Sequence, residues 1–365
     1  MTQYDTVGNN LQGELPKELG RLTSMTYLES VANQIRGQLP LEFSRLTNLS
    51  TFVFAYNDLT GTMPHWITTL TSLAFLYLSN NLLSGTLPEN FHYLKELEIL
   101  GIDDNQFSGD LGSLWQLPNL RHVYVEDNQF TGQLPQKITE TNKLLTNFDA
   151  SNNKLNGKLP VDLFRLSHLE ILDLHKNDFT GPLPQDIADD LMYEFLALHE
   201  NKLSSTIPAA LGNIRSLKHL DLSANELVGE IPIELSQLNN LTYLFLANNG
   251  FDEGPIPPFV FGYDNLRELS LKQTRRTGTI SGLIETMDKL VGLDLGSNGL
   301  SGTIPTEVAN MQNLVFLLLN ENKLSGSVPS QLGVLAKLSK SNWPLTFMNI
   351  VGPFSEKVFP RISLA

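Results

Sequence analysis

The feature that most constrains this chain is an asparagine that recurs about every 24 residues. It precedes an apolar residue by two positions, and a glycine usually follows two positions later. The 313 residues from Asn9 to Asn322 divide into 13 such steps, and Thr274 fills the single slot that lacks asparagine. A fixed period of this length is typical of repeat architectures. It predicts one solenoid of about 14 coils, not the two or three globular domains otherwise expected of 365 residues.

One clean copy of the repeat, residues 217–238, reads LKHLDLSANELVGEIPIELSQL. Leu220 and Leu222 alternate with polar residues, which is the period of a strand. The Gly229–Pro232 segment then turns the chain, because glycine permits unusual backbone angles and proline fixes φ. Each copy is therefore a short strand, a turn and a short helical or extended return. One copy cannot bury its own leucines, but stacked copies bury a continuous core.

The recurrent asparagine has a structural explanation that requires no catalytic or binding role. Inside a coil, its amide can pair with backbone donors and acceptors of adjacent turns that would otherwise stay unpaired. A row of such amides forms a ladder along the solenoid. We interpret these asparagines as structural.

The composition indicates an ordered, acidic chain. Hydrophobic residues make up 41% and charged residues 18%, which is ordinary for folded proteins. A formal net charge of −14 argues against nucleic acid and anionic membranes as partners, because an acidic surface repels phosphate. The absence of cysteine excludes disulfides, zinc–thiolate sites and cysteine nucleophiles. The sequence shows no signal peptide and no apolar run near the roughly 18 residues that a membrane span needs, so we expect no membrane insertion by this chain.

From about Tyr4 to Leu338, the pattern LxxLxxLxLxxNxLxGxIPxx resembles the plant-type leucine-rich repeat family. The specific mark is the Gly–x–Leu/Ile–Pro element, seen for example at Gly37–Pro40, Gly181–Pro184 and Gly302–Pro305. The resemblance implies an α/β solenoid: an arc with a parallel sheet on the concave face and short 3-10, helical or extended returns on the convex face. Such repeats form extracellular receptor domains and secreted inhibitors of wall-degrading enzymes, and they occur in arrays of algae and other microbial eukaryotes.

The chain departs from the family at its ends and in several copies. Plant-type ectodomains usually carry cysteine-paired caps, so either this sequence is a fragment or its ends are capped without cysteine. We expect a repeat domain over 1–338 and a tail over 339–365, which either lies over the last coil as an apolar cap or is disordered. One extra residue follows Asn249, and Arg276 stands where an apolar residue is expected. A buried arginine is costly unless it is paired, so this coil is expected to bulge outward.

Strand residues that alternate with the core leucines are expected to face solvent on the concave side. Aromatic residues in the first half of the array suit an interface, because they bring large buried area at low entropy cost. Carboxylates follow, with little basic compensation beyond Lys176. An alternative is that aspartates such as Asp173 are frequent filler that only solubilises the sheet. The predicted ligand-binding residues are Tyr77, Asp103, Asp104, Tyr124, Glu126, Asp127, Asp149, Asp173, His175 and His199.

His175 and His199 occupy equivalent slots on adjacent coils and should be neighbours. This leaves open a metal site, a pH-sensitive patch or two ordinary polar surface residues. No strained nucleophile turn and no glycine-rich phosphate loop is found. We therefore expect no enzyme activity, no catalytic residues, no cofactor and no metal.

Three functions compete. The first is a recognition domain, or a fragment of one, from a receptor-like protein, which would work outside the cell or at its surface. The second is a free-standing interaction or inhibitor protein, secreted or soluble inside the cell. The third, an enzyme, would need a pocket with perturbed titratable groups. The expected partner is a protein or peptide, basic in the favoured case, or a carbohydrate.

Overall fold

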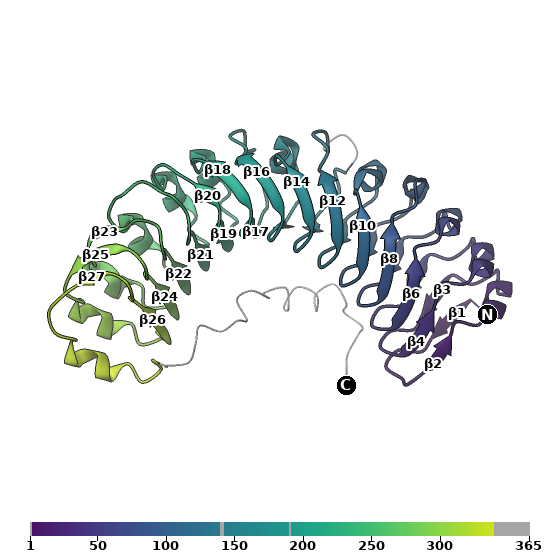
Figure 1. Cartoon of the computed structure of the whole chain (residues 1–365), viewed down its shortest axis with the longest axis horizontal. Coiled ribbons are helices and arrows are strands. Elements are labelled where there is room, and N and C mark those ends of the chain that lie inside the picture. The colour runs from purple at the N-terminus through teal and green to yellow at the C-terminus, as the bar shows by residue number, and fades with distance from the viewer. Residues whose placement is uncertain (1, 139–141, 190, 339–365) are drawn as a thin grey trace.

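The computed structural model describes residues 2–138, 142–189 and 191–338, which form an arc of stacked coils (Figure 1). A parallel sheet of 14 strands lines its concave side. Neighbouring three-residue strands pair in register, for instance Leu172 with Leu196. The predicted number of coils and the concave sheet are both confirmed. The strands of this sheet are β1 (Gln3–Asp5), β3 (Tyr27–Glu29), β5 (Thr51–Val53), β7 (Phe75–Tyr77), β9 (Ile99–Gly101), β11 (His122–Tyr124), β13 (Asn147–Asp149), β15 (Ile171–Asp173), β17 (Phe195–Ala197), β19 (His219–Asp221), β21 (Tyr243–Phe245), β22 (Glu268–Ser270), β24 (Gly292–Asp294) and β26 (Phe316–Leu318).

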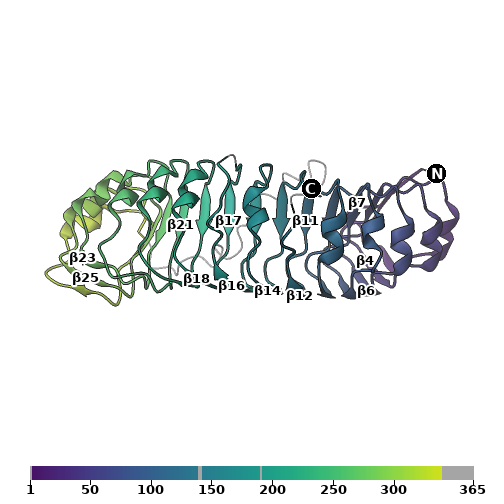
Figure 2. The same cartoon turned by 90° about the horizontal axis from the view of Figure 1, so that it is seen from above.

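A second set of parallel strands, which the sequence did not predict, runs along one flank of the arc (Figures 1 and 2). It divides into a sheet of 10 strands and a sheet of three. The larger sheet contains β2 (Gln12–Glu14), β4 (Gln34–Gly37), β6 (Asp58–Thr62), β8 (Leu82–Thr86), β10 (Gln106–Gly109), β12 (Gln129–Gln133), β14 (Lys154–Gly157), β16 (Asp178–Pro182), β18 (Lys202–Ser205) and β20 (Glu226–Leu227). The smaller contains β23 (Thr277–Thr279), β25 (Gly299–Gly302) and β27 (Lys323–Leu324).

The return segments contain short 3-10 helices, as one of the predicted alternatives had it. Most begin directly after a proline, such as Pro40 or Pro232, whose fixed φ suits the first turn. Among the described residues every helix is of this type, and none is long and apolar enough to cross a bilayer. The helices are η1 (Lys17–Arg21), η2 (Leu41–Arg45), η3 (His65–Thr69), η4 (Phe91–Tyr93), η5 (Gly112–Gln116), η6 (Val161–Arg165), η7 (Ala209–Asn213), η8 (Ile233–Gln237), η9 (Pro258–Gly262), η10 (Gly282–Thr286), η11 (Thr306–Asn310) and η12 (Ser330–Val334).

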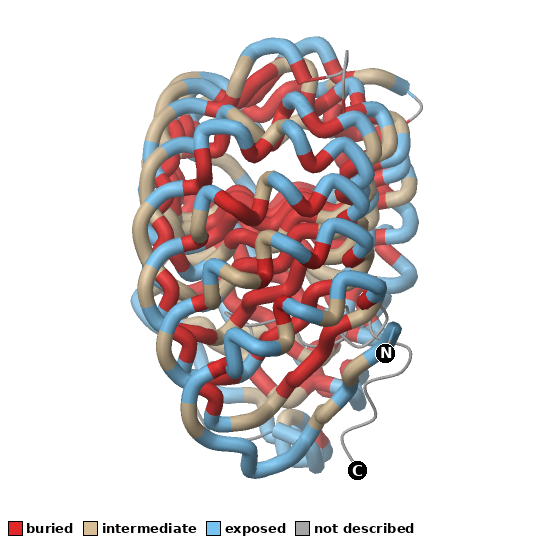
Figure 3. The backbone as a smooth tube through the Cα atoms, turned by 90° about the vertical axis from the view of Figure 1, so that its right-hand side faces the viewer, coloured by how far each residue is buried: buried red, intermediate tan, exposed pale blue. Residues whose placement is uncertain are grey.

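The core fills the inside of the coils as one continuous cluster of leucines and phenylalanines (Figure 3). The asparagine ladder runs beside it, as predicted. Asn177, for example, accepts a hydrogen bond from the backbone N–H of Leu155 (2.9 Å). Its amide nitrogen donates to the carbonyls of Ala150 (2.9 Å), Leu174 (3.2 Å) and His175 (3.2 Å). One side chain thus pairs backbone groups of two successive coils, which registers each coil on the next.

The flank sheet is interrupted at the irregular coil after Asn249. Between β20 and β23 only an isolated bridge forms, from Gly254 to Arg276. The expectation that Arg276 pushes this coil outward is wrong, because Arg276 is only 4% exposed. Its Nε donates to the carbonyl of Thr274 (2.9 Å), its Nη1 to that of Pro255 (3.2 Å), and its Nη2 to that of Asp252. Three carbonyl oxygens thus solvate the buried cation. Backbone hydrogen bonds from Gly250 N–H to the Leu227 carbonyl (2.8 Å) and from Asp252 N–H to the Gly229 carbonyl (2.9 Å) also join this coil to the one before it.

The apolar cap expected over 339–365 concerns residues outside those that the structure describes.

Candidate functional site

Each coil presents four residues to the concave side, at fixed offsets from its ladder asparagine. Three stand six, four and two positions before it. The fourth immediately precedes it and has a left-handed backbone, as at Tyr56 (φ 55°) and Asp104 (φ 48°). Because the strands pair in register, equivalent residues of successive coils stand in rows along the arc, roughly 4.8 Å apart.

Aspartates four positions before the asparagine have a local structural role. The Oδ1 atom of Asp149 accepts hydrogen bonds from the backbone N–H (3.0 Å) and the hydroxyl (2.7 Å) of Ser151. Asp173 and Asp221 accept the same backbone bond from the residues two positions later, at 3.1 and 2.9 Å. These bonds form an Asx turn at the end of the strand. For that one oxygen of each carboxyl group, the structure supports the alternative interpretation that these aspartates are filler and not ligand-binding residues. The second oxygen is left for other contacts.

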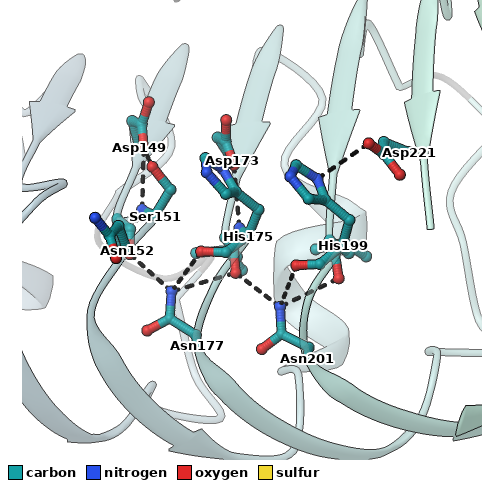
Figure 4. A network of polar contacts seen from close by, with 12 residues as sticks. Asp149, Ser151, Asn152, Asp173, His175, Asn177, His199, Asn201 and Asp221 are labelled. Carbon is teal, nitrogen blue, oxygen red and sulfur yellow. Dashed lines mark hydrogen bonds and ion pairs between the residues drawn. The ribbon is translucent and has the colours of Figure 1, made fainter. Parts of the chain in front are cut away.

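Five concave carboxyl groups of the middle coils form a line that we call the carboxylate row: Asp103, Glu126, Asp149, Asp173 and Asp221 (Figure 4 shows the last three of its aspartates). Ala197 interrupts this line on the coil between Asp173 and Asp221. Burial, with the neighbouring negative charges, raises the pKa of Asp103 to about 6, that of Asp149 to about 8 and that of Asp221 to about 7. The pKa of Glu126 is also raised well above its usual value, by burial and then by Asp149 and Asp103.

Because their pKa values are raised, Asp149 and Asp221 keep protons near neutral pH, wholly or in part, that isolated carboxyls would release. Within the described chain, the buried Oε2 atom of Glu126 has no hydrogen-bond partner. A cationic group placed over the row would relieve the mutual repulsion and displace these protons. Binding a lysine or arginine of a partner is thus the chemistry that this arrangement favours.

Two histidines stack beside the row, and their expected adjacency is confirmed. The rings of His175 and His199 lie 4.3 Å apart and nearly parallel (Figure 4). Burial alone would lower the pKa of His175, but its hydrogen bond to Asp173 (2.6 Å) and the charges of Asp173 and Asp149 raise it overall. Burial, then the neighbouring His175, lowers the pKa of His199 to about 2. His199 Nδ1 lies 3.2 Å from Asp221 Oδ2 but is not aligned for a hydrogen bond.

The stacked pair therefore carries one positive charge at most near neutral pH, because two imidazolium rings at this separation would repel each other. That charge belongs to His175 and is already paired with Asp173. Among the residues that the structure places, no three histidine, aspartate or glutamate side chains converge in a way that could hold a metal ion.

The first coils carry an apolar patch on the concave face: Val31, Val53, Ala55 and Tyr77. It is separate from the core, and Phe75 and Ile99 pack against it. The ring of Tyr77 lies over the next coil at Gly101, where a Cβ atom would stand 2.5 Å from a ring carbon. Gly101 is thus the notch that lets this tyrosine lie flat, beside the start of the carboxylate row.

Comparison with known proteins identifies the repeat. A family model described as leucine-rich repeat matches residues 194–251, and a second leucine-rich repeat model matches 72–94, 168–189 and 289–311. The chain therefore contains leucine-rich repeats. No curated protein sequence matches it.

Solved structures resemble nearly the whole leucine-rich repeat array. A PEPR1–AtPEP1 structure matches at 29% identity and a TM-score of 0.83, covering 90% of this chain and 50% of that one. The Arabidopsis receptor kinase HAESA ectodomain with an IDA peptide hormone matches at 29% identity and 0.82, covering 92% and 60%. A leucine-rich repeat protein of Leptospira interrogans matches at 27% identity and 0.71, covering 93% and 89%. The chain thus spans about half to three fifths of the length of the first two of these proteins. For the HAESA ectodomain, the solved structure is a complex with a peptide hormone ligand.

All ten predicted site residues of the leucine-rich repeat array stand at concave positions, but their exposure differs. Asp104 and Asp127 are exposed, and Asp103, Tyr124, Glu126 and His199 are half-buried. The others were expected to face solvent and are instead buried: Tyr77, Asp149, Asp173 and His175. The reason is geometric, because neighbouring side chains on the inner side of a curved sheet crowd together and cover one another.

Sequence reasoning missed the apolar patch of the array. The sequence does contain a signal for this patch, because Val31, Val53 and Ala55 occupy concave positions that polar residues fill in the middle coils. Of the concave aromatic residues in these first coils, Tyr56 is well exposed, at 58%.

Proposed function

We propose that the leucine-rich repeat array of residues 1–338 is a recognition module that binds a peptide, or an extended segment of a protein, along its concave face. The carboxylate row carries this proposal. It places carboxyl groups on four successive coils and, beyond Ala197, on one more. Burial disfavours their charge unless a cation compensates it. A basic segment lying along the row would supply that cation. A neutral carbohydrate would not, so it is the less favoured ligand.

The similarity to peptide-bound receptor ectodomains supports a receptor-like role at the cell surface. The array itself has no catalytic part in this proposal: the buried titratable groups lie along an open face and pair with each other. A free-standing array is the second candidate, favoured by the Leptospira interrogans protein, 89% of which the match covers. The complete gene product separates the two, because a membrane span beyond the array is required only by the receptor.

Selection of displayed random peptides against the folded array tests the proposal. The peptides that bind are then measured against a variant with Asp103→Asn, Glu126→Gln and Asp149→Asn. These amides keep size and shape but cannot ionise, so no carboxylate can form at these three positions when a cation binds. Affinity should fall by more than about tenfold, because losing a buried charge partner typically costs over 1.4 kcal/mol.

A matched control removes three charges from the flank instead, with Glu14→Gln, Glu226→Gln and Glu230→Gln. These residues are exposed in β2, in β20 and just after β20. The flank variant should bind like the wild type. Equal losses in both variants would mean that only net charge matters, and the concave proposal would then be abandoned. Selection of no peptide at all would also overturn it.

A further inference from the structure

We infer that the concave face recognises a two-part ligand: an extended peptide in which an apolar side chain lies three to four residues from a lysine or arginine. This inference rests on the proposed function and adds the ligand's chemical pattern. It comes from the track formed by the two residues that precede each ladder asparagine, which we call the rim track.

The rim track changes character in a fixed order along the arc. The second and third coils place Val31, Ala32, Ala55 and Tyr56 there, and all four are apolar or aromatic. The fourth coil supplies two small polar residues, and the fifth and sixth supply four carboxylates. Those later residues are Ser79, Asn80, Asp103, Asp104, Glu126 and Asp127.

A common backbone geometry makes this order a real surface and not only a sequence pattern. The last residue of each pair has nearly the same left-handed φ: 55° at Tyr56, 54° at Asn80, 48° at Asp104 and 50° at Asp127. Backbone hydrogen bonds join successive coils here, for example from Asn80 N–H to the Asp103 carbonyl (3.0 Å). Their side chains therefore leave the backbone in the same direction, coil after coil.

The apolar and acidic parts are close enough to act on one ligand. Burial raises the pKa of Tyr56, and the charges of Asp103, Asp104 and Glu126 raise it further. The phenol of Tyr56 therefore lies within electrostatic reach of three carboxylates from the fifth and sixth coils, although it is itself 58% exposed. A ligand ring or aliphatic chain packed on Tyr56 would have these carboxylates beside it.

The acidic part of the rim track has carboxyl oxygens available to a ligand. The Oε2 atom of Glu126 is buried and has no hydrogen-bond partner in the described part of the chain. Asp104 and Asp127 are exposed at the rim. Along the rim track, the next basic side chains are His175 and Lys176, two coils beyond Asp127. On the fifth and sixth coils of this track, a ligand cation would therefore meet several carboxyl oxygens and no competing positive charge.

The spacing between the apolar and the basic residue of the ligand follows from the distance between coils and from the rise per residue of an extended peptide. Neighbouring coils stand roughly 4.8 Å apart, and an extended peptide advances about 3.3 Å per residue. From Tyr56 on the third coil to the acidic fifth and sixth coils is two to three steps, or roughly 10–14 Å. An extended peptide crosses that distance in three to four residues.

The test uses the peptides selected against the folded array. The selected set should be enriched in lysine or arginine three to four positions from a large apolar residue. For each binder, replacing either residue by serine should lower the affinity about tenfold, as expected for an interface anchor worth more than 1 kcal/mol.

Two tyrosines of similar exposure make a matched pair of variants. Tyr56→Ser should weaken binding of the two-part peptides about tenfold. Tyr93→Ser, which removes a tyrosine that is 51% exposed in η4 on the other side of the coils, should leave binding unchanged. In the variant with Asp104→Asn and Asp127→Asn, the preference for lysine or arginine over norleucine should fall about tenfold.

The outcomes separate this inference from the proposed function. Peptides that need the carboxylate row but no apolar residue would support the recognition module and contradict the two-part ligand. The same conclusion would follow if Tyr56→Ser and Tyr93→Ser had equal effects on binding. Binders that lack basic residues also contradict the inference. If no peptide binds, both are overturned.

Discussion

Replacing Asp149 by asparagine should make the array more stable at alkaline pH than at acid pH, relative to the wild type. In the folded chain the pKa of Asp149 is raised from 3.8 to about 8, by burial and then by the charge of Asp173. Asparagine keeps the acceptor for the Ser151 bonds and cannot ionise. The two chains therefore differ mainly in the cost of the charge.

The sign follows from proton counts. Between pH 3.8 and 8 the folded wild type keeps a proton on Asp149 that the unfolded chain has released. Its free energy of unfolding therefore falls as the pH rises through this window and levels off above pH 8. The asparagine variant lacks this slope. The difference between the two chains should grow by up to ~1.4 kcal/mol per pH unit, on the order of 4 kcal/mol from pH 5 to pH 8.

Urea unfolding at pH 5, 6.5 and 8 measures this difference. The indole of Trp115 packs edge-on against Phe148, next to Asp149, with ring centroids 5.2 Å apart, so tryptophan fluorescence reports on this part of the array. Asp264→Asn, at an exposed position on the return path, is the control and should show no such trend. Parallel pH profiles for wild type and Asp149→Asn would refute the electrostatic account of the carboxylate row.

Three further predictions, the first with a matched control substitution, test the fold. Gly212→Ala should destabilise the array by about 1–3 kcal/mol or more in urea unfolding, because the added Cβ atom would stand 2.1 Å from the Glu234 carbonyl oxygen. Gly333 occupies the same place in η12, and a Cβ atom there would meet no atom within 4 Å. Gly333→Ala is therefore the control and should be tolerated in the same assay. Asn177→Ala should cost about 2–4 kcal/mol, because it leaves buried backbone groups unpaired; an unchanged urea midpoint would contradict the ladder's role. Arg276→Met should open residues 252–255 to protease cleavage, and a cleavage pattern like that of the wild type would show that the guanidinium is not what holds this coil.

The sequence predicted the solenoid because its period and its apolar alternation are local and repeat many times. It did not predict the flank sheet, since the strands there contain glycines that read as turns. Gly61 lies inside β6 with φ of 87°, a conformation that sequence rules assign to a turn. The strand forms because the ladder already holds each coil against the next, so pairing on the flank depends on stacking and not on local propensity.

The candidate site was predicted in its position but not in its burial. Asp104 and Asp149 both read as polar residues of a concave strand, yet one is exposed and the other is 3% exposed. What separates them is the curvature of the sheet, which covers the position four residues before the asparagine and leaves the position just before it open. The offset can be read from one repeat, but the curvature cannot. Arg276 was misjudged for a similar reason, because its three carbonyl partners come from its own coil and from the coil before it.

The break in the flank sheet between β20 and β23 also has a mechanical consequence. On both sides of it, successive coils are joined by strand pairing at the concave face and again at the flank. At the coil after Asn249 the flank has no strand ladder: it contributes a single bridge, a few backbone hydrogen bonds such as that from Asp252 N–H to the Gly229 carbonyl (2.9 Å), and the contacts of Arg276. We therefore expect the arc to bend more easily at this seam than within the two segments on either side of it. A force that pulls its two ends apart would change the curvature at this seam first and leave the rim track in the stiffer segment undistorted.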